Sequence, residues 1–135
     1  MTAKEYLNEA RLLDLRINDR LDQVHRLHAL ATKATQTLSD MPGSASNNNQ
    51  KMESIIVKIL ELENSINEDI DRLVALKKEM LAVLEKIDKA EYRVVLEKRY
   101  LNNQPWERIA SDMGCGIDNI YKMHGKALME VRVPQ

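Results

Sequence analysis

The residues that could bind a metal or act as nucleophiles are few in this 135-residue sequence. His25 and His28 are spaced i, i+3, so both could reach one metal ion, but no third ligand accompanies them. Cys115 is the single cysteine, and its neighbours predict a core position and not an activated thiol. No nucleophile–base pair, phosphate-binding glycine loop or pair of carboxylates stands out. We therefore predict no enzyme activity, no bound metal and no cofactor.

Composition limits the remaining function classes. The 20 basic and 21 acidic side chains nearly cancel, which argues against a protein that coats polyanions. Charged residues interrupt every apolar stretch well before the roughly 18 residues that a membrane span requires. Aromatic residues make up only 4% and there is no Phe, which favours narrow helix seams built from aliphatic residues. We expect a soluble, cytoplasmic, all-α protein.

The segment from residue 106 to 128 has the spacing of a helix-turn-helix. Counting Trp106 as position one, Ala110 is fifth, Gly114 ninth and Ile120 fifteenth. Two helices joined by a short turn cross steeply, so the contact needs a small residue and the turn needs a residue that tolerates positive φ. The second helix must also place a branched apolar residue against the first. We expect the core around these positions to contain Ile109, Met113, Cys115, Met123 and, at the helix start, Trp106.

The first 87 residues carry two apolar series with a repeat of 3.5, which is typical of a supercoiled helix pair. The first series is Tyr6, Ala10, Leu13, Ile17, Arg20, Val24, Leu27, Ala31, Ala34 and Leu38. The second is Met52, Ile55, Ile59, Leu62, Ile66, Asp69, Leu73, Leu76, Met80, Val83 and Ile87. Thr2 and Glu5 form a potential capping box, and "SDMPGSASNNNQK" has the composition of a linker. Residues 1–87 are thus predicted to form a long antiparallel helical hairpin, a coiled coil.

Pairing the two series antiparallel places Arg20 opposite Asp69, the only charged residue in each. We predict that the two side chains are in contact, since a polar pair in an apolar seam specifies register. The Ala-rich first seam, with Leu7, Leu21 and Leu30 flanking it, also predicts self-association through residues 1–87.

Residues 88–132 are predicted to form a separate three-helix unit. Asp88 and Glu91 have capping-box spacing, and "NQP" at 103–105 marks a break and a restart. The first helix of the unit has these inner candidates: Val94, Val95, Leu96, Tyr100 and Leu101.

This unit resembles region 4 of the sigma-70 class of transcription initiation factors. The resemblance rests on "VLEKRYLNNQPWERIASDMG" followed by "IDNIYKMHGKALMEVR". The whole chain, including "MTAKEYLNEA" and "ATKATQTLSDMPGS", further resembles a family of small proteins of unknown function encoded by temperate phages of Gram-positive bacteria.

The sigma resemblance implies that the second helix of the motif enters the DNA major groove and that the unit can also dock on RNA polymerase. Carried over to this sequence, the DNA-binding positions are Ile117, Asp118, Asn119, Tyr121, Lys122 and Lys126. Ile117 stands where the family commonly has a basic residue. Asp118 would accept a hydrogen bond from a cytosine amino group, and Lys122 would donate to a guanine edge or a phosphate.

Residues 88–135 hold eight basic and seven acidic side chains, so a single copy should bind DNA weakly. A homodimer or higher homo-oligomer would bind better through two half-sites. The expected function is a phage-type regulator of transcription in a bacterial cytoplasm, with control of late genes as its setting. The alternatives are a DNA-packaging recognition subunit and a coiled-coil interaction adaptor that has lost DNA binding.

Overall fold

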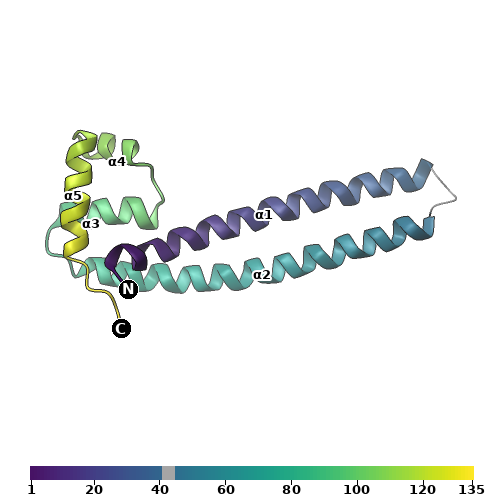
Figure 1. Ribbon diagram of the computed structural model, residues 1–135, viewed down its shortest axis with the longest axis horizontal. Coiled ribbons are helices and arrows are strands. Elements are labelled where there is room, and N and C mark those ends of the chain that lie inside the picture. Colours follow the sequence, from purple (N-terminus) through teal and green to yellow (C-terminus); the bar gives the residue numbers. More distant parts are fainter. Residues whose placement is uncertain (41–44) are drawn as a thin grey trace. The chain divides into compact units, whose positions relative to one another are not determined.

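The computed structural model of the chain describes residues 1–40 and 45–135, with side chains described for residues 1–35 and 49–135. Within these ranges the protein is all-helical, as predicted, and contains no strand (Figure 1). The elements are α1 (Ala3–Asp40), α2 (Ala45–Glu85), α3 (Ala90–Leu96), η2 (Glu97–Leu101), α4 (Trp106–Met113) and α5 (Ile117–Met129). No helix in the described part of the chain combines the length and apolarity needed to cross a bilayer.

The predicted capping box at the start of α1 is confirmed. The Glu5 N–H donates to Thr2 Oγ1 at 3.1 Å, and the Thr2 N–H donates to Glu5 Oε2 at 3.4 Å. These two bonds satisfy backbone donors that have no partner within the helix. The second predicted capping box, at Asp88 and Glu91, is wrong. Lys89 precedes α3 with extended backbone and makes no side-chain cap, so the helix begins at Ala90.

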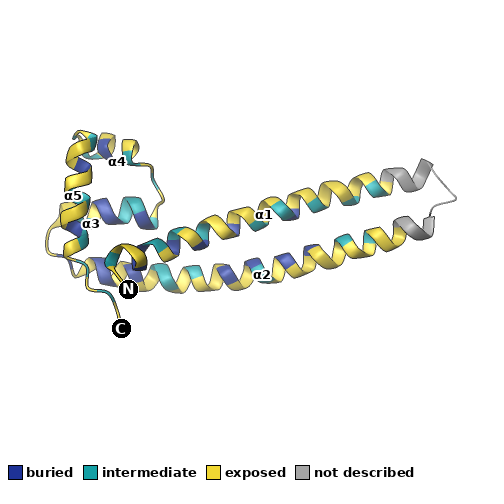
Figure 2. Cartoon of the chain, viewed as in Figure 1, coloured by how far each residue is buried: buried dark blue, intermediate teal, exposed yellow. Residues whose placement is uncertain are grey.

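The structure buries the predicted apolar series of the two long helices, together with Leu7 and Leu84 beside them. Every described member is buried or half-buried, whereas most other positions of α1 and α2 are exposed (Figure 2). A repeat of 3.5 keeps one stripe of each helix turned inward along the residues whose side chains are described, which explains the agreement. Leu38 belongs to the first series but lies outside the residues whose side chains are described. The linker is shorter than predicted, since α2 already begins at Ala45.

The predicted contact between Arg20 and Asp69 is confirmed. Arg20 Nη1 lies 2.9 Å from Asp69 Oδ2, and Arg16 Nε lies 3.1 Å from the same oxygen. Arg20 also donates a hydrogen bond to Ser65. The Asp69 side chain is only 5% exposed, so its charge is compensated by two guanidinium groups and not by water.

The chain forms two compact units that do not divide at residue 87. The first unit comprises Met1–Asp14 and Arg72–Gln135, and the second comprises Leu15–Asp71. The first turns of α1 and the last turns of α2 therefore belong with α3, α4 and α5. The predicted functional division into residues 1–87 and 88–132 stays a prediction.

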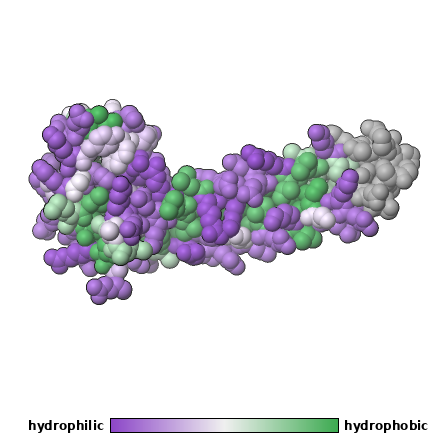
Figure 3. Space-filling model, viewed as in Figure 1, coloured by the Kyte–Doolittle hydropathy of each residue, from purple (hydrophilic) through white to green (hydrophobic). Residues whose placement is uncertain are grey.

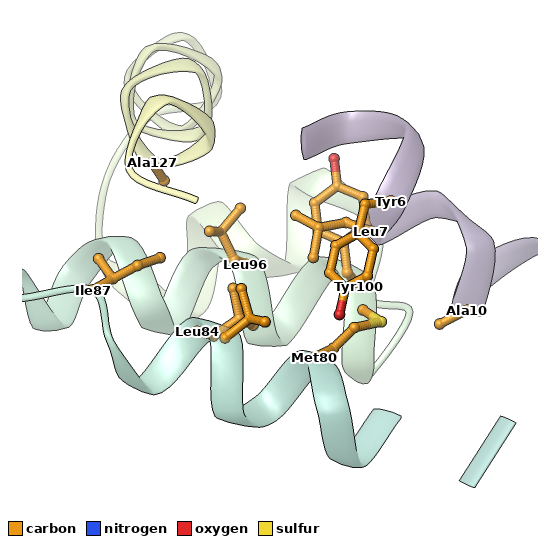
Figure 4. Packing of buried hydrophobic residues seen from close by; sticks show 10 residues of the cluster. Tyr6, Leu7, Ala10, Met80, Leu84, Ile87, Leu96, Tyr100 and Ala127 are labelled. Carbon is orange, nitrogen blue, oxygen red and sulfur yellow. The ribbon is translucent and has the colours of Figure 1, made fainter. Parts of the chain in front are cut away.

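The core of the first unit explains why the start of α1 belongs to it. Tyr6, Leu7 and Ala10 of α1 pack with residues of α2, with Leu96 and Tyr100, and with Ala127 of α5 (Figure 4). The cluster consists of Tyr6, Leu7, Ala10, Met80, Val83, Leu84, Ile87, Leu96, Tyr100 and Ala127. Leu7 is fully buried in it. Its apolar character is thus used inside the unit, so it no longer supports self-association.

Asp14 links the end of this N-terminal segment to two other elements of the first unit. Its carboxylate lies 3.2 Å from the Lys77 ammonium group on α2 and accepts a hydrogen bond from the Asn103 side chain. Asn103 has a φ of 53° and lies in the break before α4. The N-terminal segment therefore contacts the residues that set where α4 begins.

The first helix of the C-terminal part is less regular than predicted. α3 continues into η2, a π-helical turn in which the Asn102 N–H donates to the Glu97 carbonyl at 3.0 Å. Val95, Leu96 and Tyr100 are buried and Leu101 is half-buried, as expected. Val94 was wrongly assigned to the inner face, because it is 37% exposed.

Candidate nucleic-acid interface

The turn between α4 and α5 has the geometry that a helix-turn-helix needs. Gly114 has a φ of 68°, the left-handed conformation in which a side chain is strained. The Cys115 N–H donates to the Ala110 carbonyl at 3.1 Å, and the Gly114 N–H donates to the Ser111 carbonyl at 3.2 Å. These two bonds form a Schellman motif, which ends α4 and satisfies its last carbonyls. The predicted role of Gly114 is confirmed.

A small second core holds α4 against α5. Its buried members are Val95, Ile109, Ala110 and Ile120. Trp106, Met113, Cys115 and Met123 are partly buried against it. These are the residues that the spacing predicted, with Val95 of α3 added. Ala110 is small enough to let the helices approach, and Ile120 has no exposed surface.

A polar aromatic cluster joins η2, α4 and α5. The Tyr100 hydroxyl lies 2.7 Å from His124 Nε2, and the two rings stack at 5.7 Å between centroids. The Trp106 ring meets His124 edge-on at 4.6 Å, and the Arg99 guanidinium lies 4.4 Å from the Trp106 ring centre. Burial, together with the nearby positive charges of Lys4 and Arg99, lowers the pKa of His124 to about 4.

His124 was missed by the sequence analysis. It lies four residues after Ile120 and three before Ala127, so helical spacing places it on the inward face of α5. This spacing in the sequence could have identified His124 as a partly buried residue.

The structure exposes five of the six predicted DNA-binding residues on α5. Asp118, Asn119, Tyr121, Lys122 and Lys126 are exposed. Ile117, the first residue of the helix, is half-buried and therefore the least accessible of the six. Since helical positions 118, 122, 125 and 129 lie nearly opposite the buried Ile120, the outermost line of α5 passes through Gly125.

No contact in the described part of the chain requires a glycine at position 125. A Cβ atom added there meets nothing within 4 Å, so no neighbouring element requires the missing side chain. Close approach of another described element therefore does not explain this glycine. What remains is that Gly125 lowers the outer surface of α5 between its exposed polar side chains.

A shallow hollow lies beside this face of α5. Its volume is about 330 Å³, and it lies between the start of α3 and one edge of α5. It is lined by Lys89, Glu91, Tyr92, Cys115, Asn119, Lys122, Met123 and Lys126. Three of the predicted DNA-binding residues thus share a surface with Lys89, which the sequence analysis did not select.

No group of three metal-ligating side chains converges anywhere in the described ranges. His25 and His28 are both exposed on α1. Comparison of the chain with models of known protein families gave no match, and no curated protein or solved structure is significantly similar to it.

Proposed function

We propose that the protein is a phage-type DNA-binding regulator of transcription in a bacterial cytoplasm, with α4 as the supporting helix and α5 as the recognition helix. The observation that carries the proposal is the turn at Gly114, with Ala110 and Ile120 buried beside it. This arrangement fixes α5 from one side and leaves its opposite side accessible, with Asp118, Lys122 and Lys126 exposed. A helix held in this way can enter the major groove of B-DNA.

Three side chains on the exposed side of α5 have chemistry suited to DNA. Asp118 can accept a hydrogen bond from a cytosine amino group, and Lys122 can donate to a guanine edge. Lys126, one turn further along, is suited to a phosphate. Gly125 lies between the two lysines in sequence and would let the helix approach the groove wall without a clash.

A second copy of the chain supports this function in a way that one copy cannot. Residues 88–135 carry a net charge of only +1, so phosphate neutralisation by one motif is weak. The second unit exposes apolar side chains beyond its seam, among them Leu21, Leu30, Ile56, Val57 and Leu60. Figure 3 shows hydrophobic surface along this part of α1 and α2. Self-association there would bring two recognition helices to two half-sites.

A protein-binding adaptor is the second candidate. Met129 at the end of α5 is 85% exposed, and Tyr121 is 47% exposed. Met and Tyr are enriched in protein interfaces. A face with both could contact RNA polymerase in addition to DNA, within control of late genes, or instead of DNA.

Selection from a random duplex library tests the proposal without knowledge of the natural site. The purified full chain is incubated with the library, and bound DNA is recovered and sequenced over several rounds. We expect enrichment of a short motif, with inverted repeats if the protein is a dimer. Lys122→Ala should weaken binding to that motif by about 1 to 3 kcal/mol, as expected for a base contact.

Asp118→Ala provides the matched comparison. It should relax the sequence preference and leave non-specific affinity unchanged or higher, because it removes a negative charge from a surface that faces phosphates. The hypothesis of sequence-specific DNA binding would be rejected if no motif is enriched and the variants at Lys122, Lys126 and Asp118 bind DNA as wild type does. Recovery of RNA polymerase with the protein from host cells would then favour the adaptor.

A further inference from the structure

The hollow beside α5 has a distinct charge. Its lining includes three lysines, Lys89, Lys122 and Lys126, and one carboxylate, Glu91, so its net formal charge is +2. Residues 88–135 as a whole carry only +1. The positive charge of this region is therefore concentrated at one place, and the rest of its surface is neutral to slightly acidic.

The three ammonium groups are available to a ligand. Among the described residues, none of the three lysines forms an ion pair, whereas Lys98 in the same unit lies 3.2 Å from Asp112. Lys122 and Lys126 are one turn apart on α5. Lys89 immediately precedes α3, so it adds a cation from outside α5.

Lys89 is held in place by an aromatic ring. Its ammonium group lies 4.9 Å from the centre of the Tyr92 ring. Tyr92 is itself half-buried and packs against the core of the first unit. A cation above an aromatic face keeps its charge and its donors while losing part of its freedom. This cation is thus partly ordered before any ligand binds.

The lining of the hollow also includes uncharged side chains. Cys115 and Met123 contribute apolar surface, and Asn119 contributes an amide that can donate a hydrogen bond. An extended polyanion bound along the hollow could therefore meet lysines from both α5 and the start of α3.

We propose that Lys89 is a DNA-phosphate contact and that the hollow bordered by Lys89, Lys122 and Lys126 seats the sugar-phosphate backbone of one strand next to the major groove that α5 enters. The inference rests on the proposed DNA-binding function and extends it to a residue outside the helix-turn-helix. Lys89 neutralises a phosphate that α5 alone does not reach. It therefore contributes affinity for every sequence and no sequence preference.

The test is a salt titration of full-chain binding to a fluorescent duplex of random sequence, and to a selected motif when one is known. Each phosphate contact steepens the dependence of log affinity on log salt by about 0.9. Raising the salt from 50 to 200 mM weakens DNA binding by both proteins. The fold-loss in affinity should be about 3.5 times smaller for Lys89→Met than for wild type. Its affinity at low salt should be lower, and its ranking of sequences should be unchanged.

Two further variants make the result specific. Lys78→Met removes an exposed lysine of the same unit that does not line the hollow, and it should keep the wild-type salt slope. Glu91→Gln removes the only carboxylate of the hollow and should raise affinity for all sequences. Circular dichroism and thermal unfolding establish that each variant is folded.

The outcomes separate this inference from the proposed function. If wild type binds DNA, but Lys89→Met and Lys78→Met have the same salt slope, the hollow is not a phosphate seat and the recognition role of α5 stands. A Glu91→Gln variant with lowered affinity would also overturn the inference. If wild type binds no duplex at any salt concentration, the proposed function fails and the inference fails with it.

Discussion

Acid should destabilise the first unit through His124. Burial, together with the charges of Lys4 and Arg99, lowers its pKa from 6.5 to about 4. The folded protein therefore binds this proton less readily than the unfolded chain. The resulting stability is fully present above pH 6.5, declines as the pH falls from 6.5 towards 4, and is absent below that range.

The magnitude follows from the difference between the two pKa values. The drop from 6.5 to about 4 corresponds to about 3.4 kcal/mol at 1.36 kcal/mol per pKa unit. The imidazole is only half-buried, and solvent screens part of this effect, so we expect about 1 to 2 kcal/mol. Protonation would also place a second donor opposite the Tyr100 hydroxyl, which lies 2.7 Å from Nε2.

Urea unfolding of wild type and His124→Gln between pH 7.5 and pH 4 measures this effect. Glutamine does not titrate and can still accept a hydrogen bond from Tyr100. His25, His28 and the carboxylates are common to both proteins, so their titration cancels in the difference. Wild type should lose about 1 to 2 kcal/mol more than the variant over this range. The NMR signal of the His124 ring should titrate near pH 4. Equal losses in both proteins, or a ring that titrates near pH 6.5, would refute the reasoning.

Three further predictions concern the seam, the recognition helix and assembly. Arg20→Leu leaves Asp69 buried with one partner fewer and should cost about 3 kcal/mol of unfolding free energy in urea, whereas Arg20→Leu with Asp69→Leu should cost less; a double variant no more stable than the single one contradicts this. Gly125→Ala should raise the unfolding free energy by about 1 kcal/mol in thermal unfolding, since the added Cβ meets nothing within 4 Å; an unchanged or lower value would show that the glycine is structurally required. In light scattering at micromolar concentration the full chain should have a multiple of its 15.5 kDa mass, and Leu60→Lys, at an exposed position, should lower it; a wild-type monomer removes the idea of self-association.

The sequence pattern predicted best where helical repeat alone determines burial. The two seams followed from a 3.5-residue period, and the contact between Arg20 and Asp69 followed from pairing the two series antiparallel. Gly114 was predictable for a similar reason, because a left-handed turn residue at a fixed offset has few alternatives. These inferences need only local geometry and one pairing rule.

Features that depend on contacts between distant segments were not predictable in this way. Leu7 lies beside the seam, and nothing local indicates that it packs into the core of the first unit. The same limit applies to the division of the chain, because the apolar repeat of α2 continues unchanged through residue 72. Lys89 lines the hollow together with residues of α5 only because the start of α3 lies beside α5. His124 has the helical spacing of an inward-facing residue. It was missed because a histidine is not an apolar residue and was not counted in the apolar pattern of α5.

The participation of residues 1–14 in the first unit has a consequence for how the protein folds. Tyr6 donates a hydrogen bond to Glu79 at 2.9 Å, across 73 positions of the sequence. Closing a loop of that length is entropically costly, and the cost falls when intervening residues are already ordered. The second unit, Leu15–Asp71, can provide that order if its parts of α1 and α2 pack against each other first. Completion of the first unit, which contains α4 and α5, would then be the late, high-contact-order step of folding. An N-terminal deletion or a bulky N-terminal tag should slow that step, although the motif it affects lies at the other end of the chain.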